Sequence, residues 1–170
     1  MKFLNILLLT FLFATASCGF VQSFLESKKS DESTVLATDS EIKIIASNKK
    51  FKFLPSEIIA RPGQVLKIKV INELRDLPIV FSLLKKDEDP VVNAFLGIQA
   101  GESKNWWPPE EHLIFKSEIL AYNESASFKI TMPKEPGMYA FISSYPGQVD
   151  AFNGVIKIIN PKESVSTKVD

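Results

Sequence analysis

The central part of this 170-residue chain predicts an all-β fold, an antiparallel β-sandwich of seven or eight short strands with one short helix beside it. Three observations support this prediction. Apolar and polar residues alternate with a period of two in several segments, and turn signals rich in Pro and Gly separate these segments. The segments also lack the regularly interspersed helices of a parallel βαβ fold. We place this domain at residues 41–160.

The clearest strand is expected at residues 65–72, where Leu66, Ile68 and Val70 fall on one face and lysines on the other. The preceding residues 61–64 read Arg-Pro-Gly-Gln, a turn in which proline fixes φ and glycine supplies a positive φ. The other predicted strands cover residues 41–47, 51–60 with a break at Leu54–Pro55, 79–85, 125–132, 138–143 and 154–159.

A helix is predicted inside the long insertion at residues 87–112. Asp89 is the expected N-cap, Pro90 the first helical residue, and Gly97 the stop signal. The apolar positions between them are Val91, Val92, Phe95 and Leu96.

The N-terminus has the pattern of a secretory signal peptide over residues 1–17. Lys2 precedes an apolar run, and small residues follow it; the run is shorter than the roughly 20 residues that a membrane span needs. Cys18 comes next and resembles the lipidated cysteine of a bacterial lipobox, although Thr15 stands where leucine is usual. The resemblance implies a diacylglycerol and further acyl chains such as palmitate on Cys18, which would anchor the protein in the bacterial cell envelope. The alternative is a secreted protein with a free thiol.

Two polar segments flank the domain. Residues 18–40 contain the lipidated cysteine and then a stretch rich in Ser, Thr, Asp, Glu and Lys, which predicts a flexible tether. Residues 161–170 predict a disordered tail for the same reason.

The composition excludes several classes of function. One cysteine and one histidine cannot form a CxxC redox pair or a multi-histidine metal site, and no common catalytic motif is present. Lys and Arg together number 20 and so do Asp and Glu, which gives no basic excess for a nucleic acid. We therefore expect neither an enzyme nor a nucleic-acid-binding protein.

Residues 137–154 carry a resemblance to a known family. The segment GMYAFISSYPGQVDAFNG keeps the glycine, aromatic and Tyr-Pro-Gly frame that ends the cupredoxins of the azurin and auracyanin group. The resemblance extends over about residues 41–160 and implies a Greek-key sandwich with a helix in a flap insertion. It also implies blue-copper electron transfer as the activity usual in the family.

The residues that would hold copper in this family are replaced. Ser143 stands at the cysteine position, Gln148 and Ile79 at the two histidine positions, and Phe152 at the axial methionine position. A blue-copper site needs a thiolate and two imidazoles, so we expect no cofactor. Copper remains only under the alternatives of electron transfer or weak metal trafficking, the latter through His112, methionines and carboxylates.

The expected role is binding or scaffolding, with an unidentified protein as the possible partner besides the membrane. Trp106, Trp107 and Tyr145 are the candidate partner surface, because exposed aromatic residues favour protein contact. The competing interpretation is that both tryptophans pack against the flap or the sandwich edge.

The lipid anchor is directly testable. We expect Cys18→Ser to leave an unlipidated precursor, because serine supplies no thiol for the thioether bond. Metabolic labelling with palmitate and membrane fractionation measure this loss. Normal labelling and normal fractionation of the variant would exclude the anchor.

Overall fold

The computed structural model describes residues 34–38 and 41–160. The predicted signal peptide, Cys18, residues 19–33 of the tether and the tail at 161–170 lie outside the described residues. No helix in the described part of the chain is long and apolar enough to cross a membrane.

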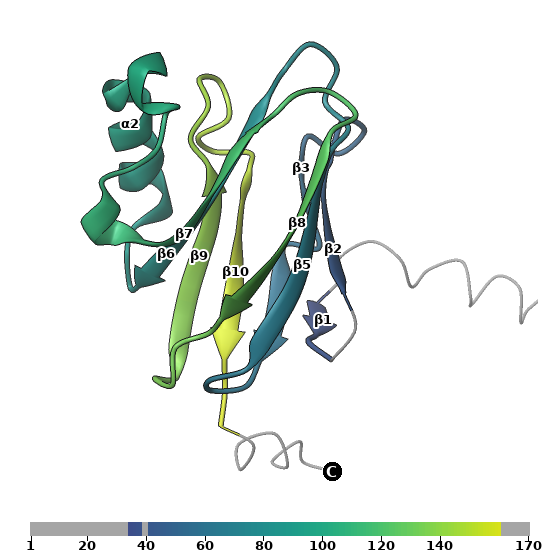
Figure 1. Ribbon diagram of the computed structural model, residues 1–170, viewed down its shortest axis with the longest axis vertical. Helices are drawn as coiled ribbons and strands as arrows, with labels where there is room; N and C mark the ends of the chain where they lie inside the picture. The colour runs from purple at the N-terminus through teal and green to yellow at the C-terminus, as the bar shows by residue number, and fades with distance from the viewer. Residues whose placement is uncertain (1–33, 39–40, 161–170) are drawn as a thin grey trace, which may run out of the picture. The chain divides into compact units, whose positions relative to one another are not determined.

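The described residues form a β-sandwich, which confirms the predicted fold class (Figure 1). Every strand predicted from residue 41 onward is present within a residue or two of its expected bounds. Two further strands appear, one of them at Thr34–Leu36 in the segment predicted as a tether. The elements are β1 (Thr34–Leu36), β2 (Ile42–Ser47), β3 (Lys52–Leu54), β4 (Glu57–Ala60), β5 (Val65–Asn72), β6 (Ile79–Lys86), α2 (Pro90–Ala100), η1 (Glu102–Lys104), η2 (Glu110–His112), β7 (Leu113–Leu120), β8 (Ser125–Thr131), β9 (Gly137–Ser143) and β10 (Asn153–Ile158).

The strands form a six-stranded sheet in the order β1-β4-β10-β9-β6-β7 and a four-stranded sheet in the order β3-β2-β5-β8 (Figure 1). Both sheets are mixed, whereas the sequence predicted antiparallel pairing. The β1–β4, β4–β10 and β2–β5 pairs are parallel. The break predicted at Leu54–Pro55 explains part of this difference, because β3 stays in the smaller sheet while β4 crosses to the larger one. There β4 runs in the same direction as β10.

Four buried phenylalanines fill the space between the sheets near one end. Phe53 of the smaller sheet lies 6.1 Å from Phe81, 5.7 Å from Phe141 and 5.4 Å from Phe152, measured between ring centroids. Burial of each ring contributes on the order of 2 kcal/mol to the stability of the folded state. These rings come from strands and a loop far apart in the sequence, so they fix the two sheets face to face.

Helix α2 packs on the outer face of the six-stranded sheet, where Ala94 joins Leu84 and Ile142 in a small apolar cluster (Figure 1). Asp89 is the N-cap as predicted, and its carboxylate accepts from the N–H groups of the second and third residues that follow it. The predicted stop at Gly97 is wrong, because the helix continues to Ala100 and Gly101 is its C-cap.

Gly97 instead allows close packing. It is buried, and a Cβ there would lie 2.6 Å from the Cβ of Ser144. The buried side of the helix is therefore made of small and polar residues, while Val92 and Phe95 are 52% and 54% exposed.

This contact predicts that Gly97→Ala destabilises the protein. Alanine favours a helix over glycine by about 1 kcal/mol, but overpacking costs about 1–3 kcal/mol. We expect a net loss in the free energy of unfolding, measured in urea. Gln99→Ala, on the exposed side of the same helix, should change stability by no more than about 0.5 kcal/mol. A Gly97→Ala protein as stable as the parent would contradict the packing argument.

Candidate functional site

The four positions at which the resemblance implies copper ligands lie at one end of the sandwich. Ser143 is the last residue of β9, and Gln148 and Phe152 follow in the loop to β10. Ile79 is the first residue of β6, the neighbour of β9 in the sheet. All four side chains are completely buried.

Hydrogen bonds connect these positions into a chain. The N–H of Val80 donates to Ser143 Oγ at 3.1 Å, and Ser143 Oγ donates to Gln148 Oε1 at 2.6 Å. Gln148 Nε2 then donates to the carbonyl oxygen of Pro78 at 2.8 Å. The two side chains thus return to the residues on either side of Ile79. We call Ser143, Gln148 and their partners Pro78 and Val80 the Ser–Gln network.

The backbone and Phe152 complete the enclosure. The N–H of Ser143 donates to the carbonyl oxygen of Phe152 at 2.8 Å. The N–H of Phe152 donates to the carbonyl oxygen of Gln148 at 3.0 Å. The Phe152 ring packs edge-on against Phe53 and Phe51, at 5.4 and 4.9 Å between centroids. Phe152, which the resemblance places at the axial methionine position, is therefore a side chain of the hydrophobic core.

These residues do not fit a blue-copper ion. Such a site requires a thiolate and two imidazole nitrogens, and the network offers a hydroxyl and an amide that already bond to each other. Phe152 and Ile79 supply no donor atom. Within residues 34–38 and 41–160, no group of three or more His, Cys, Asp or Glu side chains could hold a metal.

The aromatic residues of the candidate partner surface lie next to this end. The rings of Trp106 and Tyr145 meet edge to face at 4.7 Å between centroids, and the Ser144 hydroxyl donates to the Trp106 carbonyl oxygen at 2.5 Å. Both rings belong to half-buried residues. The flap and the β9–β10 loop are thus held together by adjacent aromatic side chains.

Trp107 is also half-buried but points to a different neighbourhood. Its Nε1 donates to the carbonyl oxygen of Ser117 at 3.0 Å, and the Lys116 ammonium lies 3.9 Å from the ring centroid. Trp107 lines a groove of about 440 Å³ together with Pro108 and Lys104. The predicted surface therefore consists of a Trp106–Tyr145 pair and a separate groove at Trp107.

His112 lies away from the Ser–Gln network. Its Nδ1 is 2.7 Å from Asn93 Oδ1 and 3.4 Å from Glu88 Oε2, and its side chain is 29% exposed. Because the amide oxygen of Asn93 can only accept, Nδ1 carries a proton. The histidine links the start of α2 to η2, a contact that sequence reasoning missed. The available signal was an asparagine at position 93 among the apolar residues of the predicted helix.

Sequence reasoning also missed the pairing of Ser143 with Gln148. Sequence showed only that the family's ligands are replaced, whereas the structure shows that two replacements bond to each other. Two consecutive serines at the end of an apolar strand were the available signal, since buried hydroxyls need partners.

Comparisons with known proteins identify similar folds among solved structures, while no family model and no curated protein sequence matches the chain. The blue copper protein auracyanin A of Chloroflexus aurantiacus shares 24% identity, with a TM-score of 0.64 and coverage of 71% of this chain and 98% of that one. The auracyanin of Roseiflexus castenholzii shares 19%, with a TM-score of 0.62 and coverage of 76% and 100%. The azurin Az-iso2 of Methylomonas sp. strain J shares 18%, with a TM-score of 0.61 and coverage of 72% and 100%. At these identities the similarity establishes the fold.

The Ser–Gln network predicts unequal effects for two buried serines. Ser143→Ala leaves the Val80 N–H and Gln148 Oε1 without partners, and each unsatisfied group costs about 1–3 kcal/mol. We expect a loss of about 2–4 kcal/mol in the free energy of unfolding, measured in urea.

Ser82→Ala is the matched control. Ser82 is as completely buried as Ser143, and its Oγ has no hydrogen-bond partner among the described residues. Removing that hydroxyl should be neutral or stabilising. Equal losses in the two variants would show that the network contributes nothing specific.

Proposed function

We propose that this cupredoxin-fold domain is an exported, membrane-anchored binding module that holds no copper and catalyses no reaction. The Ser–Gln network is the observation that carries the proposal. It satisfies the buried polar groups at the position where the resemblance implies a metal, so the fold needs no ion there.

The replacement is complete in chemical terms. A hydroxyl in place of a thiol removes the soft donor on which blue-copper chemistry depends. Gln148 retains a nitrogen, but that amide nitrogen donates to Pro78 and has no lone pair to offer a metal. A metal entering here would break three buried hydrogen bonds and gain no thiolate in return.

Membrane attachment completes the proposal. The signal peptide and the lipobox-like Cys18 support export and lipidation at the start of the mature chain. A lipid anchor keeps the domain at a membrane surface and raises its effective concentration toward partners on that surface. This suits a binding or scaffolding role in the cell envelope.

The candidate binding surface consists of Trp106 and Tyr145, which lie next to the Ser–Gln network. Both rings are partly exposed and held by fixed contacts, and rigid aromatic side chains lose little entropy when a partner covers them. The Ser–Gln network ties the β9–β10 loop to the start of β6. The loop end of the sandwich thus supports binding in place of redox chemistry.

The first test concerns copper. We expect the full chain, loaded with Cu(II) and then desalted, to retain no stoichiometric copper and to show no intense visible absorption, because no thiolate ligand is present. Elemental analysis and absorption spectroscopy measure this. One bound copper with strong visible absorption would contradict the proposal and favour the electron-transfer alternative.

Calorimetry distinguishes the remaining alternative of weak metal trafficking. That function would require copper binding tighter than about 100 μM, or about −5.5 kcal/mol. We expect no such heat signal.

The second test concerns the partner surface. A photo-crosslinking amino acid placed at Tyr145 in the native bacterium should yield one discrete adduct, because this position lies on the candidate surface. The same amino acid at Lys129, an exposed position on β8, should yield none. Adducts at both positions, or at neither, would exclude this loop end as the binding surface.

A further inference from the structure

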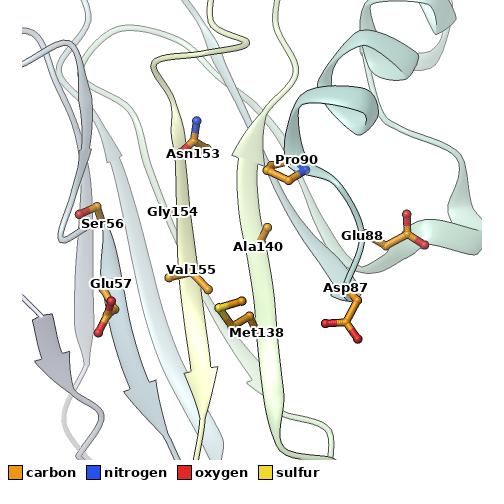
Figure 2. Close-up of a pocket in the computed structure, with 10 residues that line it drawn as sticks. All are labelled: Ser56, Glu57, Asp87, Glu88, Pro90, Met138, Ala140, Asn153, Gly154 and Val155. Carbon is orange, nitrogen blue, oxygen red and sulfur yellow. The ribbon is translucent and has the colours of Figure 1, made fainter.

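The outer face of the six-stranded sheet is only partly covered. Helix α2 packs over Leu84 and Ile142. Its first residue, Pro90, lies at the edge of a part of the sheet where Met138 is exposed to solvent. A pocket of about 580 Å³ lies in this corner, bounded by the sheet on one side and by the start of α2 on the other (Figure 2). It is separate from the Trp107 groove and shares no lining residue with it.

The floor of the pocket is apolar. Val155 of β10 and Ala140 of β9 lie opposite each other in the sheet register and form the floor together with Met138 (Figure 2). Met138 is 58% exposed, although β9 is hydrogen-bonded to a strand on each side. Met138 is exposed next to Ala140 and Val155, so the apolar surface of the pocket is continuous, and methionine adapts its shape to different partners.

Carboxylates flank this floor. Glu57 stands on the β4 side and Asp87 on the β6 side, with Val155 and Met138 between them (Figure 2). A third lining carboxylate, Glu88, is turned toward the side of α2, where it accepts from Asn93. No Lys or Arg is among the residues that line the pocket.

Two lysines lie near the pocket but are not among the residues that line it. Lys86 forms an ion pair with Asp87 at 4.0 Å and donates to Glu135 at 2.5 Å, and the hydrogen bond to Glu135 is the main cause that raises the pKa of Lys86. Lys157 lies opposite Met138 in the sheet register and outside the lining. The Asp87 side chain in turn is 71% exposed. Glu57, whose Oε1 accepts from the Thr34 hydroxyl at 3.4 Å, and Asp87 thus place carboxylates on both sides of an apolar floor.

We propose that this pocket docks an extended segment of another protein in which one apolar side chain is flanked by lysines or arginines. The apolar side chain covers Met138 and Val155, and the two cations meet Glu57 and Asp87. This surface goes beyond the loop-end surface proposed above and does not depend on it.

The dimensions of the sheet set the spacing of such a segment. Asp87 lies beside β9, because its N–H donates to the carbonyl oxygen of Met138. The strands β10 and β9 therefore lie between Glu57 and Asp87. Three interstrand steps amount to about 14 Å. An extended peptide rises about 3.3 Å per residue, so cations at its first and fifth positions are about 13 Å apart and share one face with the third. A second copy of this chain would present the same acidic rim, which disfavours self-association through this face.

The test uses the methionine methyl groups of the full chain, held in phosphatidylcholine nanodiscs so that the lipid carries no net charge. The probe is the peptide acetyl-Lys-Ser-Leu-Ser-Lys-amide. We expect it to shift the ¹³C-methyl resonance of Met138 in a saturable manner and to leave that of Met132 unchanged, since Met132 is buried in the core. The same peptide with glutamate in place of both lysines should cause no shift.

Two double variants separate charge from folding. Glu57→Gln/Asp87→Asn should weaken binding of the lysine peptide roughly tenfold, as expected from two solvent-exposed ion pairs. Asparagine is chosen because Asp87 has φ 62°, a conformation that asparagine also tolerates. Glu73→Gln/Glu118→Gln removes two exposed carboxylates elsewhere and should leave binding unchanged.

Three results would overturn the proposal. They are an unshifted Met138 methyl, equal shifts with the lysine and glutamate peptides, and a shift that depends on protein concentration without peptide. The last result would show that a second copy covers the face. None of these results bears on the Trp106–Tyr145 surface, so the two proposals fail independently.

Discussion

The hydroxyl of Ser143 is the interaction on which the loop end of this protein depends. It accepts from the backbone of β6 and donates to Gln148, and so joins two neighbouring strands to the loop that follows β9. A buried hydroxyl with both functions satisfied stabilises the fold, whereas the same group with either partner missing would be a cost. Its side-chain partners are protein groups, so this buried hydroxyl is satisfied within the fold.

The next residue shows how one strand serves two sides of the sheet. The alternation of side chains along β9 continues one residue past its end, so Ser143 points into the network while Ser144 contacts Gly97 of α2 and donates to Trp106. The close approach of α2 requires a glycine at position 97, and that approach places Trp106 against Tyr145. The aromatic surface is therefore a consequence of helix packing and of the alternation of a single strand.

The same helix also explains why part of the sheet is open. Its first turn begins at the edge of the pocket, and its buried side carries Asn93, Ala94 and Gly97. The large apolar residues Val92 and Phe95 face outward. A helix that packs through small residues lies close to the sheet but covers little of it, and Met138 consequently stays exposed.

Much of the fold could be predicted from local sequence, because strand alternation and turn chemistry are properties of neighbouring residues. The strand at residues 65–72 and the cap at Asp89 were predictable for this reason. The end of α2 was not, because Gly97 has the residue type of a stop signal but serves a contact with Ser144, which is distant in sequence. The parallel pairing of β4 with β10 was also unpredictable, since strand direction within a sheet depends on where the chain crosses between layers.

For the site, the sequence by itself determined that the four positions at which the resemblance implies copper ligands lack blue-copper donors. A hydroxyl, an amide, a phenyl ring and an aliphatic chain cannot replace a thiolate and imidazoles. Only the tertiary structure decided which interactions the residues at these positions make. A hydrogen bond between Ser143 and Gln148 depends on distance and angle, and neither is encoded locally. The acidic rim of the pocket belongs to the same class, since Glu57 and Asp87 are 30 positions apart in the chain and become neighbours across the floor only when β4, β10 and β9 assemble into one sheet.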